Sequence, residues 1–411
     1  MMWLLLLILS MQPVMGQKIF ESFDLDGTMR YVGTTTYDFD VDVATIPSFK
    51  IHKIKGDISI KGIPGMTVHI EEKVRIRAAT KMQAVNQFEE YRATVMQKAD
   101  GNVVEVIGAG HWPSRIDFSY VITTPANISV LAYTSGGDIE LRNITGQIEV
   151  KTSGGDLDLG NIIGKLTAKT SGGDIDLSHG QGNLFLSTSG GDIVIANTEG
   201  KINAHTSGGD IEVNYNSGDV MVSTSGGDIK LYSIQGKQVS GRTSGGDIDA
   251  EDITAELNVQ TSGGDLNIED TRGTVKASTS GGDIDISNIF GAADVITSGG
   301  SIVGGGLYGK INARTSGGDI EIEKSFDPSL PDHSVTLKNS NGNIYLTLPE
   351  KFPGNFDVVV KGGYSLGVID SEFPLTITRK QNEVRGMGNI GSGHYLIRLG
   401  TYNGQIVIEK D

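Results

Sequence analysis

The stretch TSGGDIDL at residues 170–177 decides the fold of this 411-residue chain, because close copies of it recur ten more times between Thr134 and Ile322. The copies begin at Thr134, Thr152, Thr170, Thr188, Thr206, Thr224, Thr243, Thr261, Thr279, Thr297 and Thr315. Nine of the ten spacings are 18 residues and one is 19. Self-similarity at a fixed short period is typical of solenoids, in which each repeat packs only against its neighbours.

The residues after each corner motif alternate between apolar and polar side chains. Ile or Leu follows the acid position in every copy, as at Ile175, and most copies carry a second aliphatic residue two positions later, as at Leu177. A period of two predicts a strand with one buried face. In most copies another Gly stands eight residues after the acid, as at Gly182, before a second alternating stretch. Each repeat is therefore expected to hold two strands and two corners.

Two all-β architectures fit this pattern, a parallel solenoid with one repeat per coil and a long antiparallel meander. An open meander of this size would leave exposed edges, whereas stacked coils bury a continuous thin core. We therefore predict an all-β fold, a parallel β-solenoid (β-helix) of 18-residue coils. A less regular β-rich region with one short helix is expected to precede it.

The chemistry of the TSGGD corner predicts how the chain turns. Paired glycines are expected to allow positive φ and a tight reversal, the Thr hydroxyl to satisfy backbone groups, and the Asp to accept hydrogen bonds from turn amides. Ser301 replaces the acid in one copy, and another copy carries an extra residue between Gly236 and Thr243. Both are interpreted as local distortions, the second as a bulge.

The regions outside the repeats divide the chain into four parts. Residues 1–16 are predicted to be a signal peptide, 17–130 a β-rich N-terminal capping region, 131–325 the solenoid, and 326–411 a C-terminal β-rich continuation and cap. Within the second part, residues 79–91 show a helical spacing of apolar residues, and Gly56-Asp-Ile-Ser-Ile60 resembles a degenerate coil.

The start of the chain and its composition predict export. MMWLLLLILS has a short apolar run followed by small residues before Gln17, which is typical of a secretory signal peptide. No later segment is apolar over the 18 or more residues that a transmembrane helix needs, so we expect a soluble mature protein that is periplasmic, cell-surface or extracellular. The chain has no Cys, and its formal net charge of −16 argues against nucleic acid as a partner.

The acids after the paired glycines are the candidate metal ligands. A column of carboxylates at strand spacing is compatible with Ca²⁺, although here Asp follows the glycines directly, unlike in the nonapeptide calcium motif. The candidates are Asp138, Asp156, Asp174, Asp192, Asp210, Asp228, Asp247, Asp265, Asp283 and Asp319. No other cofactor is expected, and the opposite strand is predicted to be more basic through Lys151, Lys169, His205, Arg242 and Arg314.

Catalysis is the weaker interpretation of these acids. Paired carboxylates on solenoids can cleave polysaccharides, but a catalytic site is a local exception to a repeat, whereas these acids recur almost unchanged. The seven His residues are scattered, without a zinc-binding or nucleophile motif. We therefore predict that the protein is not an enzyme.

The TSGGDI repeats, the degenerate GDISI coil and the Gly-rich closing strands together resemble a bacterial family of putative adhesins. This family has no known function, is built from β-strand repeats, and is similar to the head domains of putative autotransporter adhesins. The resemblance implies an exported scaffold for adhesion or macromolecular interaction at the cell envelope. The expected partner is a cell-surface or envelope macromolecule, protein or polysaccharide, with self-association as a further option. The alternative is a periplasmic or secreted polysaccharide-binding protein, stabilised by calcium.

Overall fold

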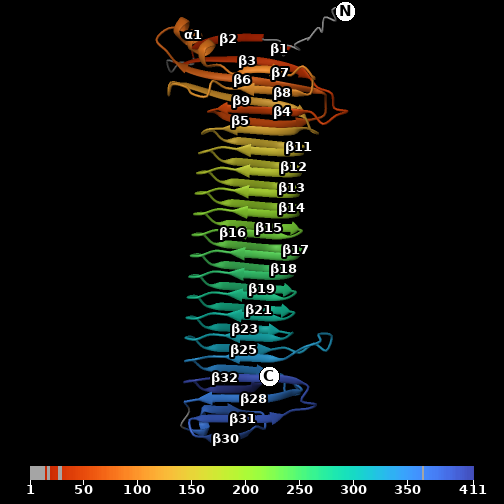
Figure 1. The fold of residues 1–411 in the computed structure, drawn as a ribbon, viewed down its shortest axis with the longest axis vertical. Coiled ribbons are helices and arrows are strands. Elements are labelled where there is room, and N and C mark those ends of the chain that lie inside the picture. The colour runs from red at the N-terminus through yellow and green to blue at the C-terminus, as the bar shows by residue number, and fades with distance from the viewer. Residues whose placement is uncertain (1–13, 16–18, 26–29, 363–364) are drawn as a thin grey trace, which may run out of the picture. The chain divides into compact units, whose positions relative to one another are not determined.

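The computed structural model describes residues 14–15, 19–25, 30–362 and 365–411 (Figure 1). The chain divides into two compact units, Met1–Gly191 and Asp192–Asp411, each described here by itself. The predicted signal peptide lies outside the described residues except for Val14 and Met15, which pair with Gln97 and Met96.

The described residues of the first unit form strands and one helix. Its elements are β1 (Val14–Met15), β2 (Ile19–Leu25), β3 (Arg30–Asp40), β4 (Ser48–Ile54), β5 (Asp57–Ile63), β6 (Thr67–Arg77), α1 (Lys81–Tyr91), β7 (Thr94–Gln97), β8 (Val103–Ile107), β9 (Ile116–Pro125), β10 (Ser129–Thr134), β11 (Ile139–Lys151), β12 (Leu157–Lys169) and β13 (Ile175–Ser187).

The described residues of the second unit form strands and a single 3₁₀ turn. Its elements are β14 (Ile193–His205), β15 (Ile211–Ser217), β16 (Val220–Ser223), β17 (Ile229–Arg242), β18 (Ile248–Gln260), β19 (Leu266–Arg272), β20 (Val275–Ser278), β21 (Ile284–Phe290), β22 (Ala293–Ile296), β23 (Ile302–Leu307), β24 (Ile311–Arg314), β25 (Ile320–Lys324), β26 (Val335–Lys338), β27 (Ile344–Leu348), β28 (Gly354–Lys361), η1 (Leu366–Val368), β29 (Ile369–Ser371), β30 (Thr376–Lys380), β31 (Glu383–Asn389), β32 (Tyr395–Thr401) and β33 (Ile406–Lys410).

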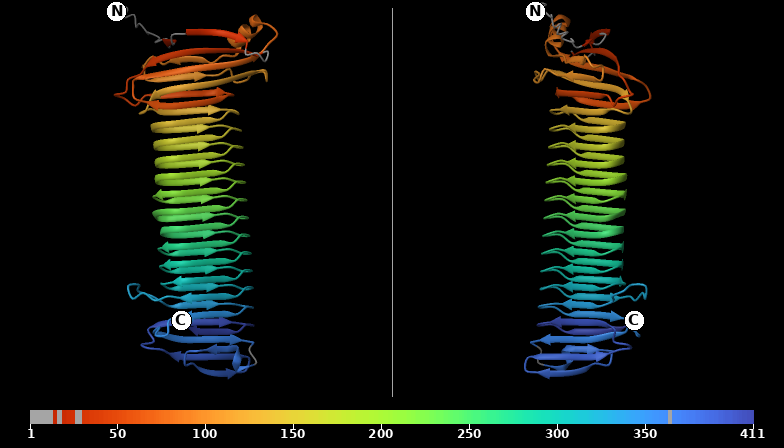
Figure 2. Two further views of the ribbon diagram at one scale, coloured as in Figure 1. Left: turned by 180° about the vertical axis from the view of Figure 1, so that it is seen from behind. Right: turned by 45° about the vertical axis from the view of Figure 1, so that its right-hand side comes forward.

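Within each unit the repeats stack as parallel coils, as the two views of Figure 2 show. Leu157 pairs with Ile175 in the first unit and Ile211 with Ile229 in the second, so each residue lies beside the one 18 positions further on. The parallel β-solenoid is thereby confirmed and the antiparallel meander is excluded. The extra residue before Thr243 produces the expected bulge, a register shift between Gln235 and Gln238.

The thin core of each coil is built from the alternating aliphatic residues. Ile139, Leu141 and Val150 are fully buried, and the same positions are buried in the coils that follow. The residues between them point outward, as in the alternating burial along β11. Burial of these columns stabilises the stack, at about 25 cal/mol per Å² of apolar surface.

The second corner of each coil differs from the sequence-based expectation. The chain turns at the fifth residue after the acid, which has a left-handed backbone at Asn143, Asn161, His179, Asn197, Tyr215, Ser233, Asp252, Asp270 and Asn288. The Gly that the sequence indicated follows three residues later, as at Gly164, where φ is +126°. Asn and Asp tolerate the left-handed region better than other residues with a side chain, which explains why they dominate this position.

The N-terminal part of the first unit joins the same stack. Ile58 of β5 pairs in parallel with Ile139 of β11, so the degenerate coil predicted around GDISI is confirmed. Above it, β3, β6 and β9 form an antiparallel layer. The predicted helix is also confirmed as α1, which Thr80 caps by accepting a hydrogen bond from the Gln83 amide and which buries Ala84 and Phe88.

The C-terminal part of the second unit ends the stack differently. After β26, the next strand in the sheet is β32, from much later in the chain, and β28 lies beside β32 in parallel. An antiparallel pair, β31 and β30, then closes the sheet. Phe326, His333, Phe352 and Tyr395 pack together in this unit, with Phe326 and Phe352 ring centroids 5.8 Å apart. A C-terminal capping role for residues 326–411 stays a prediction.

Candidate functional site

The Thr of each TSGGD corner is a buried structural residue. Thr170 donates its hydroxyl to the Gly155 carbonyl of the preceding coil at 2.8 Å and accepts from the Gly173 amide of its own coil at 3.3 Å. In the second unit Thr261 bonds Gly246 and Gly264 in the same way. The sequence-based role for the Thr is confirmed, and these hydroxyls are not available to a ligand.

The role expected for the paired glycines was wrong. None of the paired glycines in the described TSGG corners has a positive φ. Instead, the second Gly is needed because successive corners stack closely. A Cβ at Gly173 would lie 2.1 Å from the Gly155 carbonyl oxygen, whereas a Cβ at Gly172 would meet nothing nearer than 3.8 Å.

The candidate acids form a hydrogen-bonded ladder along each unit. In the first unit the Asp174 amide donates to Asp156 Oδ1 at 2.8 Å, and in the second the Asp265 amide donates to Asp247 Oδ1 at 2.7 Å. Ser301 continues the ladder, with its hydroxyl accepting from the Asp319 amide at 3.2 Å. One carboxylate oxygen of each bonded Asp is therefore engaged by the backbone of the next coil.

The outward acids on the following strand lie close enough to repel each other. Burial, followed by the charges of Asp158, Asp174 and Asp156, raises the pKa of Asp176. The pKa of Asp285 is raised by burial and by Asp283 and Asp265. In the described part of the chain, no group of three or more His, Cys, Asp or Glu residues has a metal-binding arrangement. Calcium at the ladder stays a prediction.

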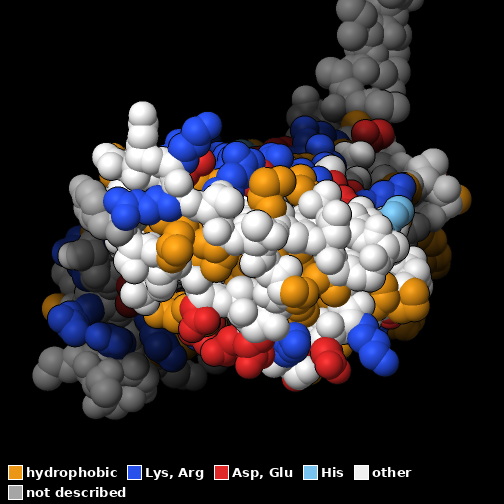
Figure 3. Space-filling model, turned by 90° about the horizontal axis from the view of Figure 1, so that it is seen from below, with side chains coloured by type: hydrophobic (Ala, Val, Ile, Leu, Met, Phe, Trp, Pro, Cys, Tyr) orange, Lys and Arg blue, Asp and Glu red, His pale blue; other side chains and the backbone are white. Residues whose placement is uncertain are grey.

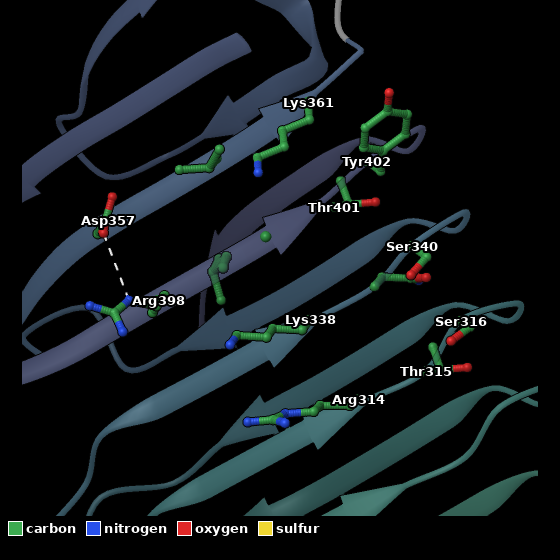
Figure 4. A pocket seen from close by; sticks show the side chains of 14 residues that line it. Arg314, Thr315, Ser316, Lys338, Ser340, Asp357, Lys361, Arg398, Thr401 and Tyr402 are labelled. Atoms are coloured by element: carbon green, nitrogen blue, oxygen red, sulfur yellow. Dashed lines mark ion pairs between the residues drawn. The ribbon is translucent and has the colours of Figure 1, made fainter.

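A different site lies on the other face of the second unit, where the repeats give way to the C-terminal strands. Arg314 of β24, Lys338 of β26, Arg398 of β32 and Lys361 of β28 surround a hollow of about 500 Å³ (Figure 4). We call this hollow the basic groove. It is lined further by Asp357, Val359, Leu399, Gly400 and Tyr402, together with Thr315, Ser316, Asn339, Ser340 and Thr401.

The strand register explains why the groove is hollow. Lys338 lies between Arg314 on one side and Gly400 on the other, and Gly400 lies beside Val359. Gly400 thus removes a side chain from the middle of an outward-facing row. A Cβ at Gly400 would find only the Val359 carbonyl oxygen, 4.0 Å away, so the space above it is open.

The groove carries uncompensated positive charge. Asp357 is its one acid, and it is engaged by Arg385 at 2.7 Å and by Arg398 at 3.8 Å. Among the described residues, Arg314, Lys338 and Lys361 have no carboxylate within ion-pair distance. In the end view of Figure 3, a cluster of acidic side chains lies at the lower edge, and basic side chains lie along the upper edge and also at the left and lower right. The arrangement is suited to binding an anion.

A buried cation also lies in the second unit. Lys324 Nζ donates to the carbonyl oxygens of Leu307 at 2.7 Å and Tyr308 at 2.5 Å, and lies 3.4 Å from His333 Nδ1. Burial lowers the pKa of Lys324 to about 7, and burial together with Lys324 lowers that of His333. These groups are enclosed, so we assign them a structural role.

Sequence reasoning found only part of the basic groove. Arg314 was expected on the basic side, together with Lys151, Lys169, His205 and Arg242. Lys338, Lys361 and Arg398 were missed, because their strands follow the insertion after β25 and pair out of chain order. One signal could have extended the row of basic residues to Lys338. This residue precedes Asn339 just as a Lys or Arg precedes the Thr in several repeats.

Comparison with known proteins assigns the chain to a family. A family model described as Toastrack DUF4097 matches residues 193–295 and 218–409, together just over half of the chain. No curated protein matches the sequence at a significant level. The assignment agrees with the resemblance to a family of β-strand repeats and with the parallel solenoid.

Several solved structures are similar to parts of the chain. A putative adhesin from Parabacteroides merdae ATCC 43184 is 16% identical, with 70% of this chain and 95% of that one covered and a TM-score of 0.31. A putative adhesin from Parabacteroides distasonis ATCC 8503 is 14% identical, covers 68% and 96%, and has a TM-score of 0.30.

Proposed function

The chain belongs to the Toastrack DUF4097 family, and from this premise we propose that it is an exported, non-enzymatic β-solenoid scaffold for adhesion or macromolecular interaction at the bacterial cell envelope. The stacked coils of each unit provide a regular surface around a thin core of buried aliphatic side chains. Such a surface is suited to holding a partner rather than to enclosing a small substrate.

One observation carries this proposal. The polar groups that recur in the repeats are used to build the coils, whereas the unpaired cations of the basic groove are not. The Thr243 hydroxyl donates to the Gly227 carbonyl of the preceding coil, and Asp247 Oδ1 accepts from the Asp265 amide of the next coil. The side chains of Arg314 and Lys338 make no such hydrogen bond in the described structure and line the open hollow. The cations of the basic groove are therefore free to bind a partner.

The same geometry supports a non-enzymatic role. Two carboxylates that act as acid and base need different environments, which hold one protonated and the other charged. The repeated acids instead share nearly identical surroundings, with Oδ1 of Asp228 and of Asp247 each bonded to the next coil's amide. Because the environment is the same at every repeat, no two of these carboxylates are set apart as an acid and a base.

Export is supported by the sequence of residues 1–16, which we propose to be a removable signal peptide. In the described residues, no helix has the length and apolar character to cross a bilayer. We propose that the protein acts at the cell envelope. The scaffold could serve this role either on the cell surface or in the periplasm.

Polysaccharide binding is the second candidate, and the basic groove favours it. Tyr402 is 56% exposed at the edge of the groove, beside cations and hydroxyl-bearing side chains. Exposed aromatic rings provide an apolar platform for a sugar face, and polar neighbours fix its orientation.

Co-sedimentation with isolated envelopes tests the scaffold role. Purified chain spanning residues 17–411 is mixed with envelope fragments from the native cells, and bound protein is measured after centrifugation across a range of concentrations. We expect saturable retention that does not consume or cleave envelope material. A chain that stays in the supernatant at every concentration would contradict the proposal.

A further inference from the structure

We propose that the basic groove binds a carboxylate-bearing polysaccharide. This inference rests on the proposed scaffold function and names the chemical class of its partner. The groove is formed by β24, β26, β32 and β28 of the second unit, at the place where the repeat pattern ends.

The charge of the groove calls for an anion. Arg314 and Lys338 are directly opposite each other on neighbouring strands, at a strand spacing of about 4.8 Å. Like charges in this relation destabilise a sheet, and in the described chain neither has an acidic partner. A bound carboxylate would remove this repulsion and gain charge-assisted hydrogen bonds from both side chains.

The groove extends beyond these two cations. Arg398 shares Asp357 with Arg385, so its own positive charge is only partly compensated. Lys361 lies on β28, three strand spacings across and two residues along the strand from Arg314, or about 16 Å away. Figure 4 shows Lys338, Arg398 and Lys361 around one hollow, with Tyr402 at its edge. A ligand that contacts all of them must be extended and carry more than one anionic group.

The floor of the groove argues against an acidic peptide that adds a strand. Such recognition needs a sheet edge with free backbone groups. Here β32 is paired on both sides, with β26 and β28, and β28 is paired with β31 as well. The groove therefore offers side chains and an aromatic ring, which suit a sugar polymer with separate carboxylates and hydroxyls.

The overall charge argues against a denser polyanion. The chain carries a net charge of −16, and duplex DNA has one negative charge per about 1.7 Å of its axis. At physiological salt, charges more than about 8 Å apart are largely screened from each other. The cations of the groove therefore decide the electrostatic energy of a ligand that stays within it, whereas a longer and denser polyanion would also meet the acidic surface around it. A polymer with about one carboxylate per sugar fits this local charge with less repulsion elsewhere.

Binding of defined polymers to the full mature chain tests the inference. Polygalacturonate is the probe, neutral dextran is the uncharged control, and polyglutamate is the acidic polypeptide control. Affinity is measured by biolayer interferometry at low and at physiological salt. We expect polygalacturonate to bind, more weakly as salt rises, and dextran and polyglutamate to bind at least tenfold more weakly.

Three variants locate the site. Gly400→Glu places a side chain and a negative charge in space that is open in the structure, and we expect it to weaken binding at least tenfold. Lys338→Gln is expected to weaken binding about two- to fivefold. Arg242→Gln, an exposed cation at the equivalent repeat position outside the groove, should change the affinity less than twofold. Unchanged thermal unfolding of each variant shows that it is folded.

The inference would be overturned if polygalacturonate did not bind, or if the Gly400→Glu chain bound it as tightly as the wild-type chain. It would also be overturned if polyglutamate bound as tightly as polygalacturonate, because the groove would then be assigned to acidic polypeptides. Repeating the envelope co-sedimentation with Gly400→Glu separates this failure from that of the scaffold role. Retention of both chains would refute the groove as the site and leave the scaffold standing. Retention of neither would refute the scaffold.

Discussion

The two glycines of one corner should respond very differently to the same substitution. In the first unit, Gly173→Ala would place a Cβ 2.1 Å from the Gly155 carbonyl oxygen and 2.5 Å from Asp156 Oδ1. Both contacts involve atoms fixed by the neighbouring coil, so the corner must move by about 1 Å to restore an ordinary contact. Gly172→Ala, one residue earlier, meets no atom closer than 3.8 Å.

The expected cost follows from the bonds that this movement breaks. Thr170 bonds the Gly155 carbonyl, the Asp174 amide bonds Asp156, and Thr188 bonds the Gly173 carbonyl, each at 2.8 Å. At about 1 kcal/mol each, their loss lowers the free energy of unfolding by about 3 kcal/mol. Overpacking alone typically costs about 1–3 kcal/mol, which is consistent. For Gly172→Ala we expect a change within about 0.5 kcal/mol, or slight stabilisation because alanine restricts the unfolded chain.

Hydrogen exchange followed by mass spectrometry is the appropriate assay, because stability in a solenoid is shared mainly between neighbouring repeats. In the full chain, Gly173→Ala should speed exchange in peptides spanning residues 165–180 by about 100-fold, since about 1.4 kcal/mol corresponds to a factor of ten. Gly172→Ala should leave those peptides almost unchanged. Similar exchange rates for the two variants would refute the view that stacking distance, rather than backbone conformation, requires the second glycine.

Further predictions concern charge and hydrogen bonding. Asp247→Asn keeps an acceptor for the Asp265 amide and should lower the free energy of unfolding by less than about 0.5 kcal/mol, whereas Asp247→Ala should cost about 1–2 kcal/mol in urea denaturation. The pKa of Lys324 is about 7 in the folded chain, whereas an unfolded lysine has a pKa of about 10.5. The free energy of unfolding should therefore rise with pH between these two values. Lys324→Met should abolish that rise. The pKa of Asp176 is raised, so the wild-type chain gains stability as pH falls through it; Asp176→Asn should stabilise the chain by a few tenths of a kcal/mol at pH 7 but not at pH 3 in thermal unfolding.

The sequence predicted the stack itself because the repeat carries two independent signals. The 18-residue period and the alternation seen at Ile175 and Leu177 together favoured parallel coils with a buried aliphatic face, and both features are present. Thr170 and Asp174 also bond backbone groups, as expected from their residue types. The same reasoning could not reveal how closely the corners stack, so it attributed the need for Gly173 to φ instead.

The candidate site was less accessible to sequence reasoning. The left-handed corner at Asn161 had a usable signal, because Asn or Asp recurs five residues after the acid in most repeats. The basic groove had almost none, because β32, which carries Arg398, comes beside β26, which carries Lys338, only when it returns to the sheet after the intervening β27–β31. Repeats predict contacts at their own period, and a contact made by a strand outside that period has no sequence spacing to reveal it.

Export to the envelope is the central claim, and the N-terminus of the native protein tests it most directly. Cells are separated into cytoplasm, envelope and medium, and the terminal peptide of the chain is identified by mass spectrometry in each fraction. The account predicts a chain that begins at Gln17 in the envelope or the medium. A chain retained in the cytoplasm with residues 1–16 still attached would contradict it.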